Sequence, residues 1–194
     1  MAGNDPFELK KLEVGSFENN CYLLFCLKTK ETLIIDPAAD AAKIINALKG
    51  LKAKYILITH GHTDHIGALS AVKNATGVPV GIHSADAARL PSPPDFHLKD
   101  GELIHFGKCA VKILHTPGHT SGGVCMLIGK YLISGDTIFP GGAGNTAIPG
   151  ASRNQILKSI KEKLFPLPGD TIIHPGHGAP STIERERNSS YYGR

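Results

Sequence analysis

The stretch Thr59-His60-Gly61-His62-Thr63-Asp64-His65 follows directly on the apolar run Tyr55-Ile56-Leu57-Ile58. It places three imidazoles and one carboxylate within residues 60–65. Imidazole nitrogen and carboxylate oxygen are donors that borderline divalent ions such as zinc accept, and no cysteine lies nearby to complete a closed structural site. The stretch therefore predicts a metal site with open coordination positions, which implies chemistry.

The composition is typical of an ordinary globular protein. The chain has 194 residues, 41% of them hydrophobic and 20% charged, so we expect one domain, residues 1–194, with a substantial core. No apolar run is as long as a membrane span, and the first residues lack a signal-peptide pattern. We therefore expect a cytoplasmic protein without membrane association. The net charge of +4 is modest, and nucleic acid is not an expected partner.

The cysteines show no redox or metal-binding pattern. They are neither paired as C-x-x-C nor densely spaced, and a domain of this length needs no disulfides. We expect four reduced, buried or half-buried thiols: Cys21, Cys26, Cys109 and Cys125.

Short apolar or alternating runs, separated by glycine, proline or asparagine, predict strands in both halves of the chain. In the first half they cover residues 8–14, 21–27, 32–35, 54–58 and 78–82. The first three are expected to be antiparallel. In the second half they cover residues 102–106, 110–115, 123–128, 131–134 and 171–174. Two sets of strands, each with its own helices, predict an α+β fold of two packed sheets with helices outside.

Helices are expected between these strands. Asp40 is predicted to cap a helix that ends near Gly50. Its buried face would consist of Ile44, Ile45 and Leu48. Further helical segments are expected over residues 66–74, 84–90 and 181–187. The proline-rich segment 91–95 is predicted to be a surface loop, and it is a candidate rim or lid of the site.

The last long helix has a clear start signal. Ser152 and Gln155 form a capping-box pattern at its N-terminus. The apolar residues that follow recur at helical spacing and predict one buried stripe. This stripe consists of Ile156, Leu157, Ile160 and Leu164.

Potential metal ligands recur at the ends of four predicted strands. Within a few residues of Ile58, Leu114, Ile133 and Ile173 come a glycine and one of His60, His119, Asp136 and His177. Because strand ends converge on layered folds, we expect these side chains to meet. His60 and His62 point to the same side of an extended stretch, and Asp64 and His65 can face a second ion. Asp136 could bridge the pair with one oxygen for each ion.

The other polar residues receive a different interpretation. Asp36 follows a predicted strand, and it could either orient a ligand through a hydrogen bond or cap a loop. The remaining histidines fall inside strands or beside loops, where surface or supporting roles are expected. They are His83, His97, His105, His115 and His174.

Taken together, these residues resemble the metallo-β-lactamase fold, specifically its glyoxalase II-like hydrolase branch. The resemblance covers about residues 20–188, and the motifs stand in the family's order. They are Ile35-Asp36-Pro37, the stretch 59–65, Thr116-Pro117-Gly118-His119-Thr120, Ser134-Gly135-Asp136-Thr137 and Pro175-Gly176-His177-Gly178. The resemblance implies an αββα sandwich of two mixed β-sheets.

The resemblance also implies two divalent metal ions, with zinc as the first choice and iron or manganese as alternatives. One ion would be held by His60, His62 and His119. The other would be held by Asp64, His65 and His177, and Asp136 would bridge both. The expected cofactor is therefore a dinuclear centre.

A dinuclear centre points to hydrolysis. A bound ion can lower the pKa of water from about 15.7 to about 7, so a hydroxide between two ions could attack a carbonyl at neutral pH. A thiolate leaves readily, which makes a small acyl thioester the expected substrate. Asp64 could orient the hydroxide, and Asp136 would hold the two ions together.

Two other functions stay open. A persulfide dioxygenase of similar length and motif order would use one iron held by the equivalents of His60, His119 and Asp136, a two-histidine, one-carboxylate set. A metal-stabilised module without turnover is the weaker alternative. β-Lactamase activity is disfavoured, because β-lactamases of this fold commonly carry cysteine or serine where Asp136 stands.

The chain departs from the glyoxalase II pattern in two places. Asn145-Thr146-Ala147 replaces a loop that typically carries arginine and an acid. In addition, true hydroxyacylglutathione hydrolases have a C-terminal helical domain that binds glutathione, whereas this chain ends soon after Asn188. The expected cleft is lined instead by Phe139, Ile148, the 91–95 loop and Arg153.

Overall fold

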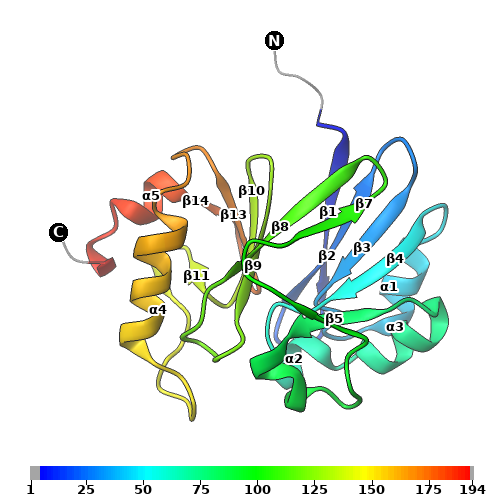
Figure 1. Ribbon diagram of the computed structural model, residues 1–194, viewed down its shortest axis with the longest axis horizontal. Coiled ribbons are helices and arrows are strands. Elements are labelled where there is room, and N and C mark those ends of the chain that lie inside the picture. The colour runs from blue at the N-terminus through cyan, green and yellow to red at the C-terminus, as the bar shows by residue number, and fades with distance from the viewer. Residues whose placement is uncertain (1–4, 193–194) are drawn as a thin grey trace.

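The computed structural model describes residues 5–192, and it contains two six-stranded sheets packed face to face with helices on both outer surfaces (Figure 1). This is the αββα sandwich that the motifs implied. Helices α1, α2 and α3 lie at one side of the sandwich and α4 and α5 at the other. Within the described residues, every helix is too short or too polar to cross a membrane.

The first sheet is antiparallel at its start and parallel afterwards. Neighbouring strands follow chain order, and the pairings β1·β2 and β2·β3 are antiparallel whereas the next three are parallel. The strands are β1 (Phe7–Val14), β2 (Asn19–Cys26), β3 (Glu31–Ile35), β4 (Lys52–Leu57), β5 (Val80–His83) and β6 (Phe96–Leu98).

The second sheet is mostly antiparallel. Its order is β14-β13-β10-β9-β8-β7, and only the β10·β13 pairing is parallel. The strands are β7 (Leu103–Phe106), β8 (Cys109–His115), β9 (Val124–Ile128), β10 (Tyr131–Gly135), β13 (Ile172–Pro175) and β14 (Ser181–Thr182). A separate hairpin consists of β11 (Ile138–Phe139) and β12 (Gly142–Ala143).

The helices divide between the two sheets. On the first sheet lie α1 (Ala41–Ala47), α2 (Thr63–Ile66), α3 (Leu69–Thr76) and the 3₁₀ helix η1 (Ser84–Arg89). On the second lie α4 (Arg153–Ser159), its π-helical continuation η2 (Ile160–Leu164), α5 (Ile183–Arg187) and the 3₁₀ turn η3 (Ser190–Tyr192). Each sheet thus has one face toward its own helices and one toward the other sheet.

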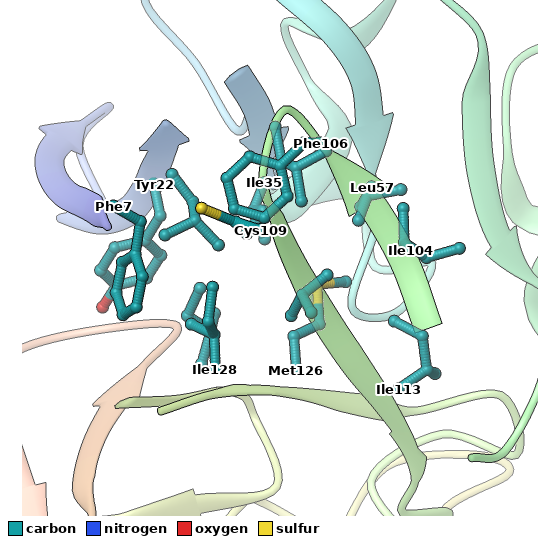
Figure 2. Close-up of a cluster of buried hydrophobic side chains, with 14 of the residues drawn as sticks. Phe7, Tyr22, Ile35, Leu57, Ile104, Phe106, Cys109, Ile113, Met126 and Ile128 are labelled. Carbon is teal, nitrogen blue, oxygen red and sulfur yellow. The ribbon is translucent and has the colours of Figure 1, made fainter. Parts of the chain in front are cut away.

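The alternation of side chains along each strand creates three hydrophobic layers. In β3, Leu33 and Ile35 enter the cluster between the sheets, whereas Ile34 enters the cluster beneath α1 and α3. Figure 2 shows the cluster between the sheets, where Phe106 and Met126 lie among side chains from both. All four cysteines are buried and free, as predicted.

One predicted helix is broken. The segment 66–74 belongs to two helices, α2 and α3, which are separated at Gly67 and Ala68. The amide of Ala68 donates to the carbonyl of Pro37 at 3.0 Å, so a tertiary bond replaces a helical one. A Cβ at Gly67 would lie only 2.5 Å from the carbonyl oxygen of Ala38. The sequence hides this contact because its partner is distant along the chain.

Helix α1 also departs from expectation at two residues. Asp40 occupies the N-cap position, but its carboxylate accepts from the amide of Gly15 at 3.0 Å and makes no capping bond. Ile45 was expected on the buried face and is 36% exposed, whereas Ile44 is fully buried. By contrast, Ser152 caps α4 as predicted, with its hydroxyl accepting from the amide of Gln155.

Four short strands were not predicted: β6, β11, β12 and β14. Each has two or three residues, too few to show an alternating pattern. The proline-rich segment 91–95 is a loop as predicted. Pro91 and Pro93 line a small cavity with Leu69 and Val80, and none of the expected metal ligands lines that cavity.

The core between the sheets can be tested on strand β7. We expect Phe106→Ala, at a fully buried ring, to reduce the free energy of unfolding by about 3–5 kcal/mol, because it removes apolar contacts and leaves a cavity. Leu103→Ala is the matched control, since Leu103 is 52% exposed on the same strand and should change stability by less than about 0.5 kcal/mol. Urea unfolding measures both. Equal effects would contradict this assignment of faces.

Candidate metal centre

All seven expected ligands lie together at one edge of the sandwich. The turn that carries His60 to His65 follows β4 of the first sheet, whereas His119, Asp136 and His177 follow strands β8, β10 and β13 of the second. Backbone hydrogen bonds join the two sheets here: Val124 donates to Thr59 at 2.9 Å, and Asn20 donates to Gly176 at 2.7 Å. The predicted convergence of strand ends is therefore present.

Three histidines form the first donor group. One nitrogen from each of His60, His62 and His119 lies within 4.8 Å of the others. The Nε2 atom of His119 is 2.9 Å from Nδ1 of His62. His60 is 2% exposed, and its ring lies edge-on to those of His62 and His119. The three rings thus point to one position.

The second donor group contains Asp64, His65 and His177, whose donor atoms also lie within 4.8 Å of one another. Oδ2 of Asp64 is 3.3 Å from Nε2 of His177 and 3.7 Å from Nε2 of His65. Asp64 and His177 are half-buried, whereas His65 has no exposed surface.

Asp136 lies between the two groups. Its Oδ1 is 3.3 Å from Nε2 of His65, and its Oδ2 is 3.5 Å from Nε2 of His119 and 3.8 Å from Nε2 of His177. Asp136 also forms a third close group with His60 and His65. The carboxylate thus lies within 4 Å of donor atoms from both groups, which is the arrangement expected of a bridging ligand.

The unpaired atoms of this cluster fit a metal ion. Within the described part of the chain, the buried atoms Nε2 of His60, Nε2 of His65 and Oδ1 of Asp136 have no hydrogen-bond partner. Buried polar atoms are normally paired, so this concentration is unusual. A divalent cation accepts electron pairs from nitrogen and oxygen donors, and it would satisfy all three atoms at once.

The opposite ring nitrogens are held by the protein. Nδ1 of His119 donates to the carbonyl of Asn145 at 2.8 Å, Nδ1 of His177 donates to the carbonyl of Phe17 at 2.9 Å, and Nδ1 of His65 contacts Oδ2 of Asp36 at 3.0 Å. A ring whose Nδ1 carries the proton presents the lone pair of Nε2. These bonds therefore aim three Nε2 atoms into the centre.

Asp36 performs both of the roles that its sequence position left open. Its carboxylate orients His65, and it also accepts from the amide and the hydroxyl of Thr59 at 2.7 and 2.6 Å. The second pair of bonds fixes the start of the histidine turn. Gly135 must approach this turn closely, because its φ is +47° and a Cβ there would lie 2.5 Å from the Thr59 hydroxyl.

The charges within the cluster are matched to cation binding. Burial, together with the neighbouring His65 and His119, holds the pKa of His60 well below its usual range, so its ring is neutral. The bond from His177 lowers the pKa of Asp64. Burial by itself would raise the pKa of Asp136, but His65 outweighs it and lowers the pKa. Neutral imidazole and ionised carboxylate are the forms that bind metals.

His65 and His177 are the exceptions in the metal-free protein. Burial lowers the pKa of His65, but the carboxylates of Asp136 and Asp36 outweigh burial and raise it to about 10. Asp64 likewise raises the pKa of His177. The protons on these two rings supply positive charge among the carboxylates, which is the charge that a metal ion would supply.

Sequence reasoning missed Asn19. This residue was interpreted as a turn between strands, but its side chain is 2% exposed and Nδ2 donates to Oδ2 of Asp64 at 3.2 Å. The same amide nitrogen is 3.3 Å from Nε2 of His177. Only the pairing of β2 with the loop after β13 brings Asn19 here, so the sequence offered no local signal.

The remaining histidines lie outside the three donor groups, as expected. His83 and His115 stack on each other, with ring centroids 3.9 Å apart. His174 packs against Tyr22 and Tyr131, and burial lowers its pKa to about 4. These contacts give them packing roles.

A groove of about 510 Å³ opens beside Asp136 and His177. Its walls include Phe139 of β11, the segment 140–145 and Tyr191 of η3. Arg153 stacks over the Tyr191 ring at 5.1 Å and donates to its hydroxyl at 3.0 Å. Phe139 therefore lines the groove as expected, whereas Ile148 and Arg153 are not among its lining residues, and Arg153 supports one wall through Tyr191.

A family model described as "Metallo-beta-lactamase superfamily" matches residues 14–177, which include every residue of the three donor groups. The chain belongs to this superfamily. Members of this fold family bind divalent metals, and the donor groups provide the His and Asp cluster that such binding needs.

Relatives within the metallo-beta-lactamase superfamily match nearly the whole chain. The probable metallo-hydrolase YqgX of Bacillus subtilis is 34% identical, and the match covers 93% of this chain and 95% of YqgX. Hydroxyacylglutathione hydrolase GloC of Haemophilus influenzae is 33% identical, and the match covers 92% of this chain and 94% of GloC. An uncharacterised protein of Aquifex aeolicus is 36% identical, and the match covers 92% of this chain and 93% of the Aquifex protein.

Solved structures of the superfamily superpose closely. BLEG-1 B3 metallo-beta-lactamase has a TM-score of 0.88 and 33% identity, and the match covers 93% of this chain and 97% of the BLEG-1 chain. ETHE1 from Myxococcus xanthus has a TM-score of 0.84 and 25% identity, and the match covers 93% of this chain and 82% of the ETHE1 chain. TTHA1623 in a di-iron-bound form has a TM-score of 0.83 and 30% identity, and the match covers 93% of this chain and 98% of the TTHA1623 chain.

Metal addition is expected to stabilise the protein. At a free Zn²⁺ concentration of about 1,000 times the dissociation constant, the free energy of unfolding of the metal-free protein should rise by about 4 kcal/mol, because the ion binds the folded cluster. Thermal unfolding after chelator treatment and after Zn²⁺ addition measures this. His62→Ala should reduce the shift, and His97→Ala, at an exposed histidine outside the cluster, should leave it unchanged. A wild-type melting temperature insensitive to Zn²⁺ would contradict the assignment.

Proposed function

We propose that the protein is a dinuclear metallohydrolase that cleaves an acyl thioester. One divalent ion is held by His60, His62 and His119 and the second by Asp64, His65 and His177, with Asp136 between them. The observation that carries this proposal is the position of Asp136, whose two oxygens face His65 and His119 at 3.3 and 3.5 Å.

Zinc is the proposed metal, because imidazole nitrogen and carboxylate oxygen suit it and cysteine is absent from the three donor groups within the described residues. Iron is the main alternative, and the similarity to TTHA1623 in its di-iron-bound form supports keeping it. When bound, divalent ions supply an activated water near neutral pH and Lewis acidity toward a carbonyl.

The protein's own residues supply orientation. The half-buried carboxylate of Asp64 is fixed by the side-chain amide of Asn19 at 3.2 Å, and in this position it would orient the activated water. Asp136 holds the two donor groups at a constant separation. Asp36 and the carbonyl of Asn145 hold the rings of His65 and His119, so none of these groups needs to rearrange during the reaction.

The groove favours a substrate with a good leaving group. No lysine, arginine or cysteine is among its lining residues within the described part of the chain, and the Tyr191 hydroxyl is already bonded to Arg153. A departing thiolate needs no proton from the protein, whereas an amine or alkoxide does. A thioester therefore fits this site best, and the GloC relative supports the same substrate class.

A mononuclear-iron persulfide dioxygenase is the second candidate. His60, His119 and Asp136 provide a two-histidine, one-carboxylate set, with Asp136 Oδ2 3.5 Å from His119 Nε2. The similarity to ETHE1 from Myxococcus xanthus keeps this function open. The similarity to BLEG-1 makes a β-lactam a necessary comparison substrate as well.

Metal content and turnover distinguish these functions. For the hydrolase we expect two equivalents of metal per chain and release of thiol from an acyl thioester, measured by elemental analysis and a thiol-reactive dye. One iron per chain with oxygen uptake on a persulfide would favour the dioxygenase instead. Metal binding without turnover on thioester, persulfide or β-lactam would indicate a metal-stabilised module.

The bridging position of Asp136 gives a second test. Asp136→Ala should lower thioester turnover by about 100-fold or more, because the two donor groups lose the carboxylate between them. Asp100→Ala is a suitable control, since Asp100 pairs with Lys163 and belongs to none of the donor groups. A normal rate in Asp136→Ala would contradict a dinuclear mechanism.

A further inference from the structure

Asp86 is a fully buried carboxylate that belongs to none of the three donor groups. It lies in η1, the 3₁₀ helix that follows β5. A buried carboxylate loses its hydration, and folded proteins retain one only where hydrogen bonds replace the lost water. The partners of Asp86 therefore show what it does.

Each oxygen of Asp86 accepts one backbone hydrogen bond, and the two bonds reach different parts of the candidate metal centre. Oδ2 accepts from the amide of Gly61 at 2.9 Å, and Oδ1 accepts from the amide of Gly122 at 2.9 Å. Gly61 stands between His60 and His62, and Gly122 follows His119 by three residues. A single carboxylate thus connects the two segments that carry the three histidines of the first donor group.

The contact is too close for side chains on the partner residues. A Cβ at Gly122 would lie 2.7 Å from Asp86, and a Cβ at Gly61 would lie 2.6 Å from Cβ of Arg89. Helix η1 therefore packs directly against the backbone of both segments. The carboxylate of Asp86 therefore bonds directly to the backbone amides of both segments.

Backbone hydrogen bonds tie together the segment after β8, which carries His119. Thr116 donates to the carbonyl of Gly123, and Gly118 donates to the carbonyl of Thr120, both at 2.8 Å. These bonds close a tight loop around His119. A constraint on Gly122 therefore also constrains the position of the imidazole of His119.

The second donor group has different supports. His65 is held by Asp36, His177 by the carbonyl of Phe17, and Asp64 by Asn19. None of these bonds involves η1. Asp36 is shared, because it also fixes Thr59 beside His60, but the two bonds of Asp86 join only the segments that carry His60, His62 and His119.

We propose that Asp86 is a positioning residue that fixes the spacing of His60, His62 and His119, so that these three imidazoles bind a divalent ion as a preassembled set. It acts through two backbone amides and touches neither the ion nor the substrate. The inference rests on the metal-binding part of the proposed function and is independent of the thioester.

The test is site-selective loss of metal affinity. In a His177→Ala background the three-histidine group is intact, and in a His119→Ala background the group of Asp64, His65 and His177 is intact. Asp86→Asn keeps the size of the side chain but turns an amide NH₂ toward a backbone N–H. We expect it to weaken Zn²⁺ binding by about 10–100-fold in the first background and to leave binding unchanged in the second. Competition with a chromophoric chelator measures the affinity.

Asp95→Asn is the matched control. Asp95 also accepts from a backbone amide, that of Val80 at 2.7 Å, and it pairs with Lys73, but it bonds to no segment that carries a donor. This control should leave Zn²⁺ affinity unchanged in both backgrounds. The visible spectrum of bound Co²⁺ in the His177→Ala background gives a second readout, and Asp86→Asn should change it because the three nitrogens are no longer held in place.

The melting temperature of each metal-free variant verifies folding. If Asp86→Asn does not fold, Asp86→Ser retains a single acceptor in a smaller side chain and should show the same site-selective loss. Unchanged affinity in the His177→Ala background would overturn the proposal. An equal loss in both backgrounds would also overturn it, because Asp86 would then act on the whole fold. Neither result depends on whether thioesters are cleaved.

Discussion

Hydrogen bonds between the two sheets hold their strand ends together beside the candidate metal centre. The amide of Val124 reaches the carbonyl of Thr59, the amide of Asn20 reaches the carbonyl of Gly176, and the hydroxyl of Tyr22 reaches the carbonyl of Pro175 at 2.7 Å. Hydrophobic packing between the sheets is non-directional and would tolerate sliding. These bonds are directional, so they set the register in which donors from one sheet meet donors from the other.

Ionisable groups and unpaired polar atoms gather at this edge of the metal-free fold. Carboxylates and imidazoles are concentrated where water is largely excluded, and several of their atoms are unpaired. Protons on His65 and His177 offset part of the negative charge. A cluster whose unpaired donor atoms a cation would satisfy is expected at a functional site, where local rules of stability give way to chemistry.

The sequence predicted the features that depend on local pattern. Strand β3 and the turn after β4 were clear because a short apolar run and the crowded histidines are visible within a few residues. The break at Gly67, the exposure of Ile45 and the bond from Asp40 to Gly15 depend on neighbours that are distant along the chain. The same is true of Asn19 and Asp86, which resemble ordinary polar residues until the fold shows what surrounds them.

His119 is held by the main-chain carbonyl of Asn145, not by a side chain. Any residue at position 145 presents that carbonyl, so the metal donor and the adjoining wall of the groove are free to evolve separately. Mutations in this loop can alter which molecules enter while the orientation of the imidazole is preserved. An ancestral centre can in this way be inherited intact by descendants with different substrates.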